Sequence, residues 1–66
     1  MKFHVGQTLM VVSKDGLRHH FEVPSRVIVE CVEKGDCFVR EAVSDIPLRQ
    51  YVSNCDLTAV KSAVVV

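Results

Sequence analysis

The sequence has little of what marks the commonest functional classes. Eight lysines and arginines offset eight aspartates and glutamates, so the formal net charge is +0, and tryptophan is absent. Nucleic-acid binders usually present a basic patch, and this neutrality therefore disfavours nucleic acid as the partner. No apolar run approaches the roughly 20 residues that cross a bilayer. We therefore expect no membrane span and no membrane partner.

Cysteine usage points to a reducing compartment. Three cysteines leave at least one thiol unpaired, and the start of the chain carries Lys2, His4 and Gly6 where a secretory signal needs apolar residues. We therefore expect a cytoplasmic protein. Cys31 and Cys37 flank a turn, where a disulfide is geometrically conceivable. We favour free, buried cysteines, since cysteine packs as a small hydrophobe in cytosolic proteins.

Motifs for catalysis and for metal binding are also missing. His19 and His20 are adjacent, so on a strand they point to opposite faces, and no cysteines form the close pairs typical of zinc sites. We interpret one of these histidines as buried and the other as exposed. The glycine-rich phosphate loop, the nucleophile elbow and the His-Glu metal helix are all absent. We expect no enzyme activity, no metal and no cofactor.

The residue in excess is valine. Fourteen valines against a combined seven leucines and alanines favour strands over helices. The strongest pattern is a β-hairpin over residues 26–42 with its break at Gly35. Its register depends on the length of the turn and stays open. We favour the register that places Val27, Val29 and Val39 in the core.

The other predicted elements follow from alternation and turn residues. Along residues 17–23, Leu17, His19, Phe21 and Val23 alternate with polar residues, which predicts a strand with one buried face. Gly16 is expected to supply the positive φ of the preceding turn. The remaining elements are a strand at 8–13, a loop at 43–48, a strand at 49–53, a helical turn at 54–57 and a final strand at 58–66. We expect one small domain, 1–66, with little room for a deep pocket.

Five short strands joined by tight turns favour closure into a small barrel. Residues 3–9, the central hairpin, and Tyr51-Val52 followed by residues 55–60 resemble the opening, the middle and the closing turn-plus-strand of small SH3-like β-barrel domains. The resemblance implies an all-β fold, a five-stranded SH3-like barrel with one short helical turn before the last strand. The aromatic cluster with which SH3 domains hold proline-rich peptides is missing, and an OB-like barrel is the alternative.

Candidate binding residues are arginines beside aromatic rings. Arg40 shares a strand face with Phe38, and Arg49 shares one with Tyr51, a combination enriched in binding surfaces. Arg18 lies in a second, weaker positive patch. The alternative interpretation is a barrel with Phe38 in its core and ordinary surface arginines.

These observations favour a stand-alone, non-enzymatic protein-binding module. Its size and lack of motifs suggest a phage or mobile-element accessory factor that inhibits or redirects a host protein. One alternative is an RNA- or DNA-binding barrel, with arginines on phosphates and Phe38 or Tyr51 stacked on a base. Another is a homodimer joined through strand edges. The apolar residues 63–66 fit either the last barrel strand or pairing with another chain.

Overall fold

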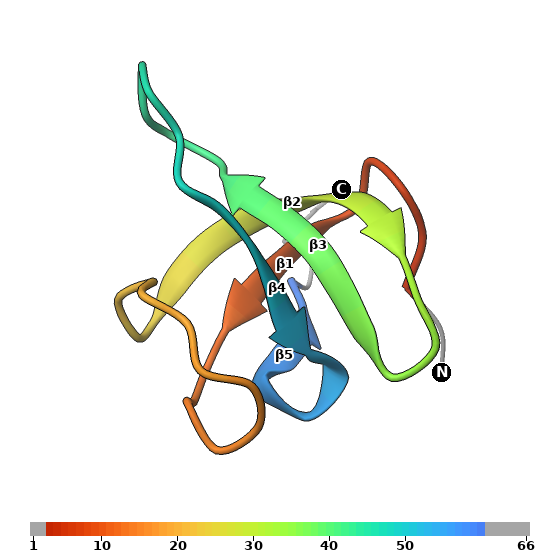
Figure 1. Cartoon of the computed structure of the whole chain (residues 1–66). Coiled ribbons are helices and arrows are strands. Elements are labelled where there is room, and N and C mark those ends of the chain that lie inside the picture. The colour runs from red at the N-terminus through yellow and green to blue at the C-terminus, as the bar shows by residue number, and fades with distance from the viewer. Residues whose placement is uncertain (1–2, 61–66) are drawn as a thin grey trace, which may run out of the picture.

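The structure, a computed structural model, describes residues 3–60 as five antiparallel strands (Figure 1). The strands are β1 (Thr8–Val11), β2 (Ser25–Val32), β3 (Asp36–Glu41), β4 (Arg49–Ser53) and β5 (Leu57–Ala59). A single 3-10 turn, η1 (Asn54–Asp56), precedes β5. The predicted all-β class, with a total of five strands and one short helical turn before the last of them, is confirmed. Within the described part of the chain, no helix has the length and apolar character that crossing a membrane requires.

The strands lie in the order β4-β3-β2-β1-β5 in one curled sheet. In the central hairpin Val29 lies opposite Val39, and the register shifts by a bulge before Cys31 pairs with Phe38. Val27, Val29 and Val39 are all buried. The favoured register is therefore confirmed, and the bulge bends β2 where the sheet curls.

Alternation along the strands builds the core, because every second side chain points inward. The buried apolar residues are Leu9 and Val11 of β1, Val27 and Val29 of β2, Cys37 and Val39 of β3, Val52 of β4, Leu57 of β5, and Phe21. The predicted loop at 43–48 is also present, and it projects from the body between β3 and β4 (Figure 1).

The predicted strand at 17–23 is wrong, because residues 12–24 form a loop. His19 and Phe21 are buried, whereas Leu17 and Val23 are each 42% exposed. The reason is local hydrogen bonding by the imidazole. His19 Nδ1 accepts from the Phe21 N–H at 3.2 Å, and Nε2 donates to the Ser13 carbonyl at 2.9 Å. These bonds tie residues 13, 19 and 21 together within the loop, and residues 12–24 join no ladder of the sheet.

A buried carboxylate anchors this loop. Asp56, fully buried in η1, accepts hydrogen bonds from the Ser13 hydroxyl and from the N–H groups of Asp15 and Gly16 at 3.1 and 3.0 Å. Burial alone would raise the pKa of Asp56. The bonds from Ser13, Gly16 and Asp15, with a further one from the Cys55 thiol, outweigh burial and hold the pKa below its usual value. The loop is therefore tied to the turn before β5.

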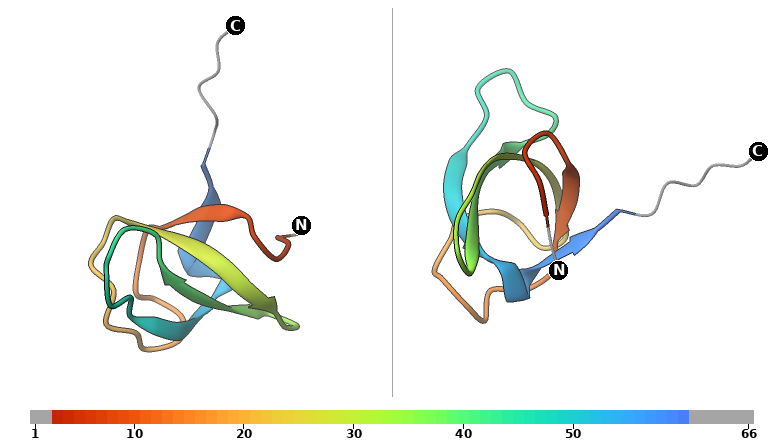
Figure 2. Two further views of the ribbon diagram at one scale, coloured as in Figure 1. Left: turned by 90° about the horizontal axis from the view of Figure 1, so that it is seen from above. Right: turned by 90° about the vertical axis from the view of Figure 1, so that its right-hand side faces the viewer.

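The end strands β4 and β5 do not pair with each other, so hydrogen bonds do not close the described sheet into a barrel. Figure 2 shows the loop at 12–24, drawn in orange, lying along the open side between β4 and β5. His20 donates its N–H to Gln50 Oε1 at 2.6 Å, and a Cβ at Gly16 would lie 2.4 Å from the Ser53 Cβ. Close approach, and not the expected positive φ, therefore requires glycine at position 16. The predicted strand at 58–66 is present as β5 up to Ala59, and residues 61–66 lie outside the described residues.

Candidate functional site

The outer face of β3 and β4 brings together four of the five predicted binding residues. Phe38 lies opposite Tyr51, and Arg40 lies opposite Arg49. Residue pairs along an antiparallel ladder alternate between hydrogen-bonded and non-hydrogen-bonded pairs. In the β3–β4 ladder the inward-pointing pairs are the hydrogen-bonded ones, so both outward-pointing pairs are non-hydrogen-bonded. Side chains approach most closely at such pairs. We call Phe38 and Tyr51 the aromatic row, and Arg40 and Arg49 the arginine row.

The aromatic row is a packed but accessible pair of rings. The centroids lie 5.0 Å apart and the ring planes are tilted by 56°. This tilted arrangement is one that aromatic pairs prefer. Phe38 is half-buried on the outer face and is not part of the core, while Tyr51 is 45% exposed. The alternative that placed Phe38 in the core is therefore wrong.

The arginine row is held together by a carboxylate on the neighbouring strand. Like charges directly opposite each other destabilise a sheet. Glu30 on β2 offsets this repulsion, since its Oε2 lies 2.9 Å from Arg40 Nε and its Oε1 lies 3.3 Å from Arg49 Nε. One carboxylate faces two guanidinium groups, which leaves one excess positive charge. The Arg49 side chain is 55% exposed, so this charge is accessible.

Acidic side chains lie at the other end of the same face. Asp36 begins β3 and alternation places it on the face of Phe38 and Arg40. Glu33 lies in the β2–β3 turn. The negative charge of Glu33, followed by partial burial and then by smaller effects of Cys31 and Asp36, raises the pKa of Tyr51. The phenol is therefore neutral at physiological pH. We call Glu33 and Asp36 the acidic end, and the two rows with the acidic end form the strip.

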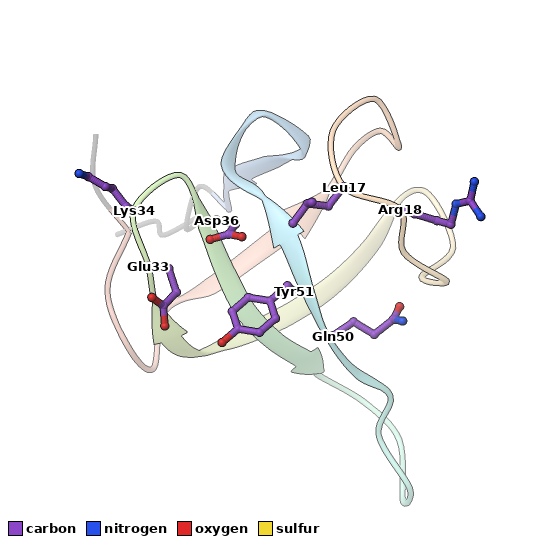
Figure 3. Close-up of a pocket in the computed structure, with 7 residues that line it drawn as sticks. All are labelled: Leu17, Arg18, Glu33, Lys34, Asp36, Gln50 and Tyr51. Carbon is purple, nitrogen blue, oxygen red and sulfur yellow. The ribbon is translucent and has the colours of Figure 1, made fainter.

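A shallow, open depression of about 620 Å³ covers the acidic end of the strip (Figure 3). Leu17 and Arg18 of the loop form one wall, the β2–β3 turn forms the other, and Tyr51 lies between them. Arg18, the fifth predicted residue, points away from the Tyr51 ring in this view. The structure thus places Arg18 on the rim of the depression and outside the strip.

The cysteines do not form a reactive site on this face. Cys37 is buried as expected, but Cys31 is exposed, which corrects the prediction for that thiol, and Cys55 is exposed as well. Cys31 pairs with Phe38 and not with Cys37, so the two thiols do not face each other across the ladder. The Glu33 carboxylate accepts a hydrogen bond from the Cys31 thiol and raises its pKa, the opposite of what activates a nucleophile.

The adjacent histidines are one buried and one exposed residue, as predicted. Across residues 3–60 no three potential metal ligands come together. No family model, curated protein or solved structure matches this chain. The SH3-like resemblance therefore stays a prediction, and the strip must be interpreted from its own chemistry.

Proposed function

We propose that this protein is a non-enzymatic module that binds another protein through the strip. The observation that carries the proposal is an exposed tyrosine, packed against a second, tilted ring, beside an arginine pair that shares one carboxylate. Tyrosine and arginine are enriched among the residues that dominate binding energy. Because neighbouring strands and Glu30 position these side chains, little conformational freedom remains to be lost on binding.

The charge distribution favours a protein over nucleic acid. A phosphate backbone is negative at every step, and it gains most from a continuous basic surface. Here Glu30 on the neighbouring strand pairs with both members of the arginine row, and Glu33 and Asp36 lie at the other end of the same face. RNA or DNA binding is therefore the alternative function. A homodimer joined through the free edge of β4 is disfavoured. The loop at 12–24 contacts β4 along that edge, where a strand of a second copy would have to pair.

Affinity capture from a nuclease-treated lysate of the source cells tests this proposal. We expect wild-type protein to retain a partner protein, and Arg49→Ala/Tyr51→Ala to lose it. Val12→Ala/Lys14→Ala is the matched control, since it removes one positive charge and one exposed apolar side chain outside the strip. Circular dichroism of each variant checks that the fold is intact.

The nucleic-acid alternative predicts a different result of the same capture experiment. Loss of the captured protein on nuclease treatment, together with submicromolar RNA or DNA binding at physiological salt, would favour the nucleic-acid alternative. The narrower hypothesis, a phage or mobile-element factor that inhibits or redirects a host protein, is tested by the identity of the captured protein.

A further inference from the structure

The strip is polarised along its length. The arginine row at one end has one excess positive charge, and the aromatic row lies in the middle. At the other end Glu33 and Asp36 both line the depression with Tyr51. Lys34 and Arg18 also line the depression, but Figure 3 shows both of these side chains pointing away from the Tyr51 ring, whereas Glu33 and Asp36 lie beside it. Along β3 and the adjoining β2–β3 turn, the order of chemistries is therefore positive, aromatic, negative.

The spacing of these chemistries matches that of an extended chain. Successive outward residues of β3 are Arg40, Phe38 and Asp36, two positions apart. Alternate side chains of any extended segment are separated by about 6.6–6.8 Å, the same repeat. From this match we infer that the strip recognises an extended protein segment with an acidic residue, an apolar residue and a basic residue at alternate positions. The inference rests on the proposed protein-binding function.

Each position of such a segment has a defined partner. Its carboxylate faces the arginine row, where charge-assisted hydrogen bonds to guanidinium are the strongest available. Its apolar side chain covers Tyr51, and its basic side chain enters the depression beside Glu33 and Asp36. The segment can run in either direction along the strip. A segment that runs the opposite way needs its residues in the opposite order: basic, apolar, acidic. A ligand with one sign of charge is attracted at one end and repelled at the other.

Three synthetic peptides test this inference. One peptide contains Glu-Ser-Phe-Ser-Lys. The second has glutamate at both the first and the fifth of these positions, and the third has lysine at both. All three have glycine flanks and capped ends. Each is titrated into ¹⁵N-labelled protein and followed by NMR. We expect the mixed peptide to bind at least about threefold more tightly than either control, since each mismatched end loses one exposed ion pair. Its shifts should fall on β3 and β4.

A charge-reversed variant gives a second readout. Glu33→Lys/Asp36→Lys should transfer the preference to the two-glutamate peptide. Glu22→Lys/Asp45→Lys changes the net charge equally at exposed residues outside the strip and should keep the original preference. Equal affinity for all three peptides, or no shift at millimolar peptide, would overturn the inference. In that case a nuclease-resistant partner that is lost with Arg49→Ala/Tyr51→Ala would still support the proposed function, and absence of such a partner would overturn both.

Discussion

Replacing Asp56 by asparagine should destabilise the fold, because Asp56 holds the loop at 12–24 in place. The side chain is fully buried, and its two oxygens accept hydrogen bonds from Ser13, Asp15 and Gly16. Asparagine has nearly the same shape but only one acceptor oxygen. If that oxygen keeps Ser13 and Asp15, the amide nitrogen faces the Gly16 N–H, and a donor meets a donor.

The magnitude follows from these bonds. Leaving the Gly16 N–H without an acceptor costs about 1–3 kcal/mol, and weakening the others from charged to neutral costs about 1 kcal/mol more. We therefore expect Asp56→Asn to lower the free energy of unfolding by about 2–4 kcal/mol. A domain of this length is stable by only roughly 3–10 kcal/mol. Ser13→Ala removes one donor and should cost about 1 kcal/mol.

Urea unfolding followed by far-UV circular dichroism measures this loss. With a slope near 1 kcal/mol/M, the midpoint for Asp56→Asn should fall by about 2 M or more. Acid gives a second check. Because hydrogen bonding holds the folded-state pKa of Asp56 below the unfolded value of about 3.9, its stabilisation is present above that pH and is lost as pH falls through the folded pKa. The difference between wild type and Asp56→Asn should therefore narrow on acidification. A loss below about 0.5 kcal/mol at neutral pH would refute this anchor.

The core, the cysteine thiols and the charge distribution each lead to one further prediction. Val29→Asp places an unpaired carboxylate in the core and should cost about 3 kcal/mol or more in urea unfolding, while Lys34→Asp in the exposed turn should be mild. An iodoacetamide time course should label Cys31 and Cys55 in the folded protein and Cys37 only on unfolding, and early labelling of Cys37 would contradict its burial. Fluorescence anisotropy with single-stranded DNA or RNA should show only weak binding that disappears between about 50 and 200 mM salt.

The two rows could be predicted in part because strand periodicity is a local property. Residues two apart on one strand share a face, which placed Phe38 with Arg40 and Tyr51 with Arg49. What alternation does not reveal is which residues face each other across two strands. That depends on the length of the β3–β4 loop, so the contact between the two rings and the opposition of the arginines emerged only from the structure.

Other features depended on contacts that are distant in sequence or on irregular backbone. Glu30 lies at the bulge after Val29 and pairs with both arginines, and the sequence carries no clear signal for a bulge there. Asp56 binds backbone groups about 40 positions earlier, so its role is invisible to a local pattern. At residues 17–23 the predicted inner face is only half realised, since His19 and Phe21 are buried while Leu17 and Val23 are exposed, and the His19 hydrogen bonds to the loop backbone have no signal in a strand pattern.

The most direct test of the central claim is a footprint of the captured partner on ¹⁵N-labelled protein. The account predicts that the backbone amide signals that shift or broaden belong to β3, β4 and the β2–β3 turn, and that Arg49→Ala/Tyr51→Ala abolishes the effect. Signals that change only in β1, β5 or the projecting loop at 42–48, with β3 and β4 unaffected, would contradict binding through the strip.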